Sequence, residues 1–262
     1  MADFVEFSVA MGVARVTLNR PDVLNSFNDQ MGREFLDVLS TVKDQADVRA
    51  ILLTGKGRAF CAGQDLAEVM PADDRPAVDL RGIVANRYNL IVRTIRETEK
   101  PFVCAVNGVA AGAGANLALA CDFVVASRRA SFIQSFSNIG LVPDTGGSFF
   151  LPRLIGLQRA NALMMLGGKL SADDALGIGL IYEVVAEEDL ETRSLELATL
   201  LSNKPTKGLG LTKRLLNASM ANTLEQQLVM EAELQSVAGA TSDYREGVTA
   251  FVEKRTPRYL GR

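Results

Sequence analysis

The stretch from Phe102 to Cys121 contains no charged residue, and this strongly limits where it can lie in a folded chain. It consists of an apolar run, FVCAV, a glycine-rich loop, NGVAAGAG, and a second apolar run, ANLALA. Its length would span a bilayer, but Asn107 and Asn116 interrupt it, and Ala and Gly dominate it instead of Leu and Ile. We therefore expect a buried strand, a tight loop and a buried helix inside a globular core.

The glycine-rich loop also suggests chemistry, because it opens a helix. Unpaired N–H groups at a helix start stabilise an anion or a developing negative charge. An upstream loop, AFCAGQDL, offers a second N–H, and downstream the segment IGLVPDTGG places one acid, Asp144, in an apolar turn. Two N–H donors and one acid are a minimal set for moving a proton beside a carbonyl. Two alternatives remain: Asp144 can cap the helix that follows it, and the glycines can simply allow close packing.

Several classes of function are excluded by composition. The chain has no histidine, so Ser-His-Asp catalysis and His-ligated zinc are ruled out. Its three cysteines, Cys61, Cys104 and Cys121, lack a CxxC spacing, which indicates free thiols in a reducing compartment, and we expect a cytoplasmic protein. With a net charge of −3, a pI near 5.3 and no basic leader segment, we expect neither a nucleic-acid nor a membrane partner.

Hydrophobic periodicity predicts alternating strands and helices up to about residue 200. The expected strands lie at 14–18, 50–53, 102–106, 123–126 and 180–185, and the expected helices at 27–42, 77–98, 113–120 and after Asp144.

Beyond Asp189 the strand signal disappears. The expected helices there are 189–202, 206–219, 223–238 and 243–254. Ser171 with Asp174, and Asp243 with Glu246, are expected to form capping boxes. We predict a strand-and-helix core over 1–200 and a C-terminal helical region over 201–262.

Five motifs occur in one order along nearly the whole chain. They are RPDVLNSFN, AFCAGQDL, AVNGVAAGAGANLALACD, GLVPDTGG and AFVEKR. In that order and spacing they resemble the crotonase (enoyl-CoA hydratase/isomerase) family. The resemblance implies an α/β fold, a spiral of ββα units followed by C-terminal helices that build homotrimers, often paired into hexamers. It also implies an acyl-CoA thioester as substrate, with no metal and no separate cofactor.

The resemblance assigns roles residue by residue. It implies that the backbone N–H groups of Gln64 and Ala113 bind the thioester oxygen and that Asp144 transfers the proton. The two glutamates of hydratases fall on Asn116 and Phe136, so the resemblance favours an isomerase. The implied substrate and CoA contacts are Val23, Leu24, Ala62, Gln64, Asp65, Leu66 and Ala113, together with Phe251 and Lys254, commonly from a neighbouring subunit.

The resemblance implies isomerisation of a ring-epoxidised phenylacetyl-CoA or of a Δ3-enoyl-CoA. The acyl group would be enclosed by residues 70–95 and by the C-terminal helices. Three alternatives remain open: a 2-enoyl-CoA hydratase that relies on Asp144 alone, a non-catalytic acyl-CoA-binding subunit, and an RNA-binding protein, which the acidic charge disfavours.

Overall fold

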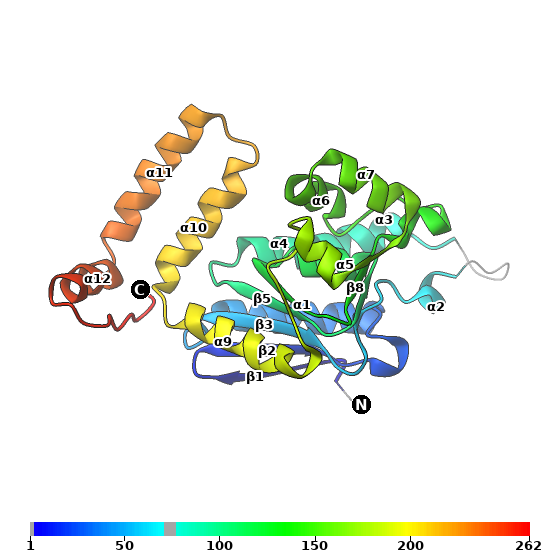
Figure 1. The fold of residues 1–262 in the computed structure, drawn as a ribbon, viewed down its shortest axis with the longest axis horizontal. Helices are drawn as coiled ribbons and strands as arrows, with labels where there is room; N and C mark the ends of the chain where they lie inside the picture. Colours follow the sequence, from blue (N-terminus) through cyan, green and yellow to red (C-terminus); the bar gives the residue numbers. More distant parts are fainter. Residues whose placement is uncertain (1–2, 71–76) are drawn as a thin grey trace.

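The structure is a computed structural model that describes residues 3–70 and 77–262. Its larger sheet has the strand order β1-β2-β3-β5-β7-β10, and every neighbouring pair except β1–β2 is parallel (Figure 1). The smaller sheet has the order β4-β6-β8-β9, with only β9 antiparallel to its neighbour. The strands of the larger sheet are β1 (Val5–Ala10), β2 (Val13–Leu18), β3 (Ala50–Gly55), β5 (Phe102–Val106), β7 (Phe123–Ser127) and β10 (Glu183–Val185). Those of the smaller sheet are β4 (Ala59–Cys61), β6 (Val109–Ala111), β8 (Ser131–Ile133) and β9 (Lys169–Ser171).

Helices connect and cover these strands. The α-helices of the body are α1 (Asp29–Asp44), α2 (Leu66–Val69), α3 (Leu80–Ile83), α4 (Asn89–Glu97), α5 (Ala113–Leu119), α6 (Gly147–Ile155), α7 (Leu157–Leu166), α8 (Ala172–Gly177) and α9 (Leu190–Ser202). A π-helix, η2 (Val84–Tyr88), joins α3 to α4, and 3-10 helices lie at η1 (Pro21–Val23), η3 (Ser135–Ile139) and η4 (Glu187–Asp189). The sequence of strands and helices confirms the predicted α/β class.

Strand β5 shows how the two faces of the larger sheet are used. All five of its residues are buried, and successive side chains point to opposite faces. Phe102, Cys104 and Val106 pack in the main core, whereas Val103 and Ala105 pack in a second core beneath α9. The uncharged stretch therefore forms a strand, a tight loop and a buried helix, as predicted. Within the described residues, no helix is long and apolar enough to cross a membrane.

The predicted elements differ from the observed ones mainly where the pattern was short or irregular. The helix predicted over 77–98 is divided by the π-helix, and the strand predicted at 180–185 begins only at Glu183. Strand β1 was missed, and so were the four strands of the smaller sheet, which have three residues each.

The two predicted capping boxes had different outcomes. Ser171 caps α8, accepting from the Asp174 N–H at 3.1 Å, although the Asp174 carboxylate accepts from the Ser171 hydroxyl rather than from its backbone. The box of Asp243 and Glu246 is wrong, because Thr241 caps α12 and Asp243 instead accepts from the N–H groups of Leu260 and Gly261.

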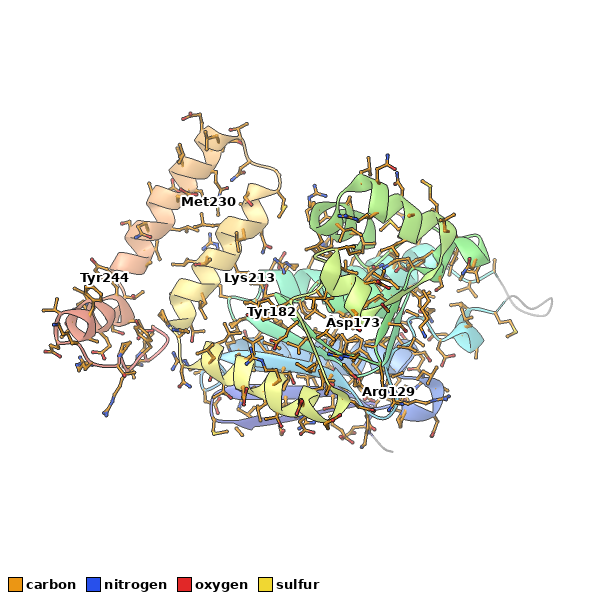
Figure 2. All side chains as sticks on the ribbon, viewed as in Figure 1. Arg129, Asp173, Tyr182, Lys213, Met230 and Tyr244 are labelled. Carbon is orange, nitrogen blue, oxygen red and sulfur yellow. The ribbon has the colours of Figure 1, made fainter. Side chains whose placement is uncertain are left out.

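Three helices extend from one side of the body: α10 (Thr206–Ser219), α11 (Leu224–Gly239) and α12 (Ser242–Val252) (Figure 1). Lys213 lies where α10 meets the body (Figure 2), and it donates to the Ile95 carbonyl and to Asp122 at 2.8 Å. Burial lowers the pKa of Lys213 although Asp122 opposes the change.

The division of the chain into 1–200 and 201–262 as separate domains stays a prediction.

Candidate functional site

Two loops meet where the neighbouring strands β4 and β6 end. The first loop contains Gly63, and the second leads into α5 at Ala113. A Cβ atom on Gly63 would lie 2.8 Å from the Ala111 carbonyl oxygen and 3.3 Å from the Ala113 nitrogen, and the φ of Gly63 is +93°. Only glycine tolerates this combination of contact and backbone angle. Gly63 therefore allows the two loops to touch.

The N–H groups of Gln64 and Ala113 are both unpaired at this junction. Phe27 donates its N–H to the Gly63 carbonyl at 2.7 Å and accepts from the Asp65 N–H at 2.8 Å. Because direction alternates along extended backbone, the Gln64 N–H faces away from Phe27. Ala113 opens α5, and the first N–H groups of a helix lack intrahelical acceptors. Across the part of the chain that the structure describes, neither N–H donates to a protein acceptor.

Asp144 lies in the turn between η3 and α6. Thr145 and Gly146 have φ values of +51° and +75°, so the chain reverses sharply before the helix. The Thr145 hydroxyl donates to Asp144 Oδ1 at 2.8 Å. Burial raises the pKa of Asp144 above its usual range, and the Thr145 hydrogen bond opposes the rise. The N-cap of α6 is Gly146 without a side-chain bond, so the interpretation of the Asp144 carboxylate as a helix cap is wrong.

Asn116 connects this turn to α5. It is fully buried, its Nδ2 donates to the Asp144 carbonyl oxygen at 2.9 Å, and its Oδ1 accepts from Gln134 Nε2 at 2.7 Å. A Cβ on Gly147 would lie 2.3 Å from Asn116 Nδ2, so glycine leaves room for the amide. Phe136 is also buried and offers only apolar surface. The two positions aligned with hydratase glutamates therefore hold no acid.

Five of the predicted CoA contacts gather around the first loop: Val23, Leu24, Ala62, Asp65 and Leu66. Ala62 donates its N–H to the Leu24 carbonyl at 2.9 Å, and the Asp65 carboxylate accepts from Arg20 at 3.0 Å. The side chains of Val23 and Leu66 are exposed. These contacts join the two segments into one surface with apolar side chains facing outward.

Phe251 and Lys254 lie elsewhere. Phe251 is in α12, with 86% of its surface exposed, and Lys254 follows that helix. Figure 1 shows α12 and α2 at opposite ends of the molecule. A single chain therefore does not bring these two residues to the other predicted contacts. Of the expected acyl-pocket segment 70–95, residues 71–76 lie outside the described residues.

A polar cluster behind Gln64 was not predicted. Its members are Glu68, Arg87 and Tyr88, which contact the Gln64 side chain. Burial, and the nearby Cys61 thiol and Asp144 carboxylate, raise the pKa of Tyr88 well above its usual range. The Tyr88 hydroxyl donates to Gln64 Oε1 at 2.9 Å. Its sequence signal was weak: two adjacent polar residues in an otherwise amphipathic helix.

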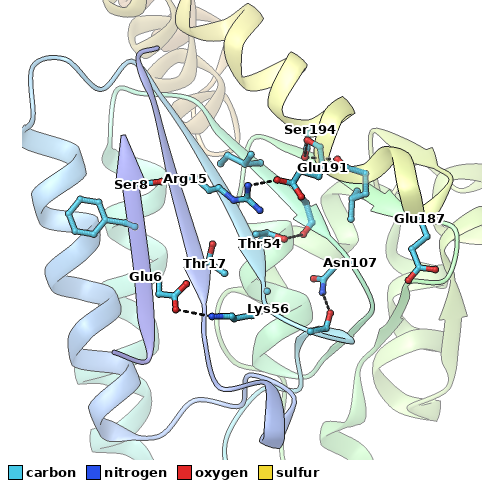
Figure 3. A pocket seen from close by; sticks show the side chains of 16 residues that line it. Glu6, Ser8, Arg15, Thr17, Thr54, Lys56, Asn107, Glu187, Glu191 and Ser194 are labelled. Atoms are coloured by element: carbon cyan, nitrogen blue, oxygen red, sulfur yellow. Dashed lines mark hydrogen bonds and ion pairs between the residues drawn. The ribbon is translucent and has the colours of Figure 1, made fainter. Parts of the chain in front are cut away.

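A separate cavity of about 650 Å³ lies between the larger sheet and the start of α9 (Figure 3). Its lining includes the ion pairs Lys56–Glu6, at 2.9 Å, and Arg15–Glu191. It includes none of the predicted site residues. The remaining charged residue of its lining, Glu187, pairs with Arg129 outside the cavity. Because all of these charges are paired, the loop junction is the better candidate for chemistry.

Chemically, the junction offers two unpaired N–H groups for an oxyanion, and the half-buried carboxyl group of Asp144, in the turn that Asn116 bonds to α5, is available for proton exchange. Two N–H donors and one acid are groups that can move a proton beside a carbonyl. The profile of the enoyl-CoA hydratase/isomerase family matches residues 8–262. The chain belongs to this family, also called the crotonase family, which confirms the resemblance seen in its motifs.

Relatives of known name cover the whole chain. The chain is 47% identical over 262 residues to the 1,2-epoxyphenylacetyl-CoA isomerase of Escherichia coli (strain K12), covering 100% of each. It is 40% identical over 258 residues to the probable enoyl-CoA hydratase of Rhodobacter capsulatus, covering 98% of each. The crystal structure of a putative enoyl-CoA hydratase/isomerase from Mycobacterium abscessus matches with a TM-score of 0.92 and 36% identity, over 98% of this chain and 100% of that one. The crotonase fold is confirmed, while isomerases and hydratases both occur among the relatives.

Proposed function

We propose that this protein is an acyl-CoA isomerase that acts through a thioester enolate. The proposed substrate is 1,2-epoxyphenylacetyl-CoA, converted to an oxepin-CoA, or a Δ3-enoyl-CoA, converted to its Δ2 isomer. The observation that carries the proposal is one half-buried acid, Asp144, whose turn is bonded through Asn116 to α5, the helix that begins at one of the two unpaired backbone N–H groups. The relative named as a 1,2-epoxyphenylacetyl-CoA isomerase supports the first substrate.

In this mechanism the thioester oxygen lies between the N–H groups of Gln64 and Ala113. These donors stabilise the negative charge as the enolate forms, and removing one such donor typically costs about 3–4 kcal/mol of activation free energy. Asp144 removes a proton beside the thioester and returns it elsewhere on the conjugated system. A raised pKa suits this role, because a base works best when its pKa approaches the operating pH. Isomerisation involves no net redox change, so we propose no metal and no cofactor beyond the CoA of the substrate.

Hydration is the competing activity, and it is the one named for the Rhodobacter relative. It requires that water be positioned and activated beside the double bond. Asn116 is already committed to the Asp144 carbonyl and to Gln134, and Phe136 carries no polar group. The argument for an isomerase is thus that only one acid, Asp144, remains to act on the substrate.

We also propose a homotrimer, alone or paired into a hexamer, with no nucleic-acid or membrane partner. The exposed apolar residues of the C-terminal helices, Leu216, Leu224, Leu228, Val229, Val248, Phe251 and Val252, support burial against other subunits. In such an assembly, Phe251 and Lys254 would complete the CoA site of a neighbour. A monomer with full activity in analytical ultracentrifugation would contradict this.

The test is turnover of a panel of acyl-CoA esters, with isomerisation and hydration measured separately by mass and by absorbance. We expect isomerisation of 1,2-epoxyphenylacetyl-CoA or of a Δ3-enoyl-CoA to be much faster than hydration of crotonyl-CoA. Comparable rates would favour the hydratase. Binding without turnover of any ester would favour the non-catalytic acyl-CoA-binding subunit.

A further inference from the structure

We propose that Arg87 and Glu68 are positioning residues that act through the side chain of Gln64. They hold residues 62–65, here called the oxyanion loop, in the geometry that the proposed reaction needs. The inference rests on the proposed function, because it concerns the direction of the Gln64 backbone N–H. The inference assigns a role in the proposed reaction to two residues, and neither of them touches the thioester or exchanges a proton with it.

The Gln64 side chain is held from three sides. Its Oε1 accepts from Arg87 Nη1 at 3.1 Å and from the Tyr88 hydroxyl at 2.9 Å. Its Nε2 donates to Glu68 Oε2 at 2.6 Å. An amide bonded at both ends in this way cannot rotate freely, so the backbone of Gln64 is fixed together with it.

Arg87 and Glu68 are also bonded directly to each other, at 2.9 Å. Arg87 is only 7% exposed. Burial disfavours its charge, but the hydrogen bonds and ion pair with Glu68 outweigh that effect and raise the pKa of Arg87. Burial likewise acts to raise the pKa of Glu68, and the bonds from Arg87 and Gln64 outweigh it and lower the pKa. Both groups therefore stay charged, and the pair persists at neutral pH.

The pair connects the loop to the body of the protein. Glu68 Oε1 accepts from the Asp29 N–H at 2.6 Å, at the start of α1. A Cβ on Gly32 in α1 would lie 2.8 Å from the Cγ and Cδ atoms of Arg87, so α1 leaves a slot for the arginine stem. The oxyanion loop is thus fastened to a sixteen-residue helix rather than left free at the surface.

The π-helix explains why two consecutive side chains reach the same amide. Arg87 and Tyr88 are its last residues, and both are buried. A π-helical turn inside an α-helix is rare and frequently marks a functional site. Here it directs both side chains toward Gln64.

The expected consequence concerns the chemical step more than binding. Misplacing a catalytic group by about 1 Å can cost about 10²-fold in rate. Loss of the pair should let the Gln64 N–H drift from the thioester oxygen, while contacts to the rest of CoA remain. We therefore expect kcat to fall by about 10- to 10²-fold with little change in KM.

The experiment uses a dimethylaminocinnamoyl-CoA ester as a probe of carbonyl polarisation. Its absorbance shifts to longer wavelength when the thioester oxygen accepts strong hydrogen bonds. We expect a red shift with the wild-type protein and at most half of it with Arg87→Met, at a Kd within about threefold of wild type. Glu68→Gln is the second variant, since it keeps the size of the side chain and is less disruptive to folding. The control is Arg129→Met, which removes an exposed ion pair with Glu187 that contacts neither Gln64 nor its partners, and it should retain the full shift.

The outcomes separate the two proposals. A full red shift in both variants, beside a shifted wild type, would overturn the positioning role and leave the proposed isomerase intact. An unshifted wild-type complex would overturn the oxyanion role of Gln64 and Ala113, and this inference with it. A reduced shift in Arg129→Met equal to that of Arg87→Met would also overturn it, because losing an unrelated ion pair would then have the same effect.

Discussion

The loop that carries Gln64 and the turn that carries Asp144 both belong to the proposed site, but different kinds of side chain hold them in place. Charged groups hold the loop. Arg20 pairs with Asp65, the residue after Gln64, and Arg87 pairs with Glu68. Each of these ion pairs is at least partly buried and bonded to further groups, which is the arrangement in which ion pairs fix geometry.

Uncharged groups hold the turn. The Asn116 amide bonds the Asp144 carbonyl oxygen, and Gln134 bonds Asn116 in turn. Among the described residues, the Asp144 carboxylate bonds only to the Thr145 hydroxyl and to its own backbone N–H. No arginine or lysine pairs with it within that part of the chain.

The difference follows from what each group must do. The Gln64 N–H keeps one charge state throughout the proposed reaction, so ion pairs nearby only fix its direction. In the proposed reaction Asp144 gains and loses a proton, and a neighbouring cation would lower its pKa and weaken it as a base. Neutral amides position the turn without that effect. The comparison yields four predictions, which begin with the largest expected effect.

Asp144→Asn removes the proton carrier without changing the size of the side chain. We expect kcat to fall by about 10² to 10⁴-fold, the range typical of general acid–base groups. The red shift of the bound chromophore should persist, because the oxyanion loop is anchored independently. Steady-state kinetics and the binding assay check this together. Near-normal isomerisation by the folded variant would remove Asp144 from the mechanism.

Gly63→Ala tests the other half of the comparison. The added Cβ would approach the Ala111 carbonyl oxygen at a φ that disfavours alanine, so the junction of the two loops must shift. We expect kcat to fall by up to about 10²-fold, the lower end of the cost of losing one oxyanion donor.

Gly177→Ala in α8 is the matched control for this variant. Nothing lies within 4 Å of its added Cβ, and we expect unchanged kinetics. Equal kinetics for the two alanine variants would show that the loop junction does not depend on Gly63.

Asn116→Leu removes the uncharged amide that holds the Asp144 turn against α5. It breaks the bond to the Asp144 carbonyl and leaves the buried Gln134 amide without its acceptor, which costs about 1–3 kcal/mol of unfolding free energy. We expect a lower urea midpoint and a lower kcat at unchanged Kd for the chromophore.

The control for this variant is Asn203→Leu, which loses one exposed bond to the Thr199 carbonyl and should change neither quantity. An Asn116→Leu variant with wild-type kcat would show that the turn holds its shape without the amide.

Much of the fold could be predicted because the central strands are continuous apolar runs with clear ends. Strand β5 begins after Pro101, and β7 begins after Asp122, as the sequence indicates. The strands of the smaller sheet could not be predicted, because three residues are too few to show alternation. The Asp243 capping box failed for a tertiary reason: the chain end returns to bond that carboxylate.

The parts of the proposed site that use backbone groups were identified from short motifs, and their role stays a prediction. Gly63, Gln64 and Ala113 lie in glycine-rich segments whose chemistry depends on local conformation. Arg87 and Glu68 were not predictable, because they are 19 residues apart and meet only through the π-helix. No periodic pattern in the sequence predicts a π-helix, since it arises from packing rather than from a repeat of apolar positions.

The smallest expected effect concerns stability. It measures how much the charged Asp144 carboxylate, which has no cation beside it, lowers the free energy of unfolding. Burial raises the pKa of Asp144 in the folded state above its unfolded value, so charging the carboxyl weakens folding. This penalty is absent below the unfolded pKa, near 4 for a typical Asp, and grows as the pH rises through the folded pKa. Asp144→Asn has no such charge, so we expect a higher Tm than wild type at pH 7 and an equal Tm near pH 3. Thermal unfolding of both proteins across this range measures it. A lower Tm for Asp144→Asn at pH 7 would mean that the surroundings stabilise the charged carboxylate. The claim that the turn, unlike the loop, has no charge-stabilising partner would then be wrong.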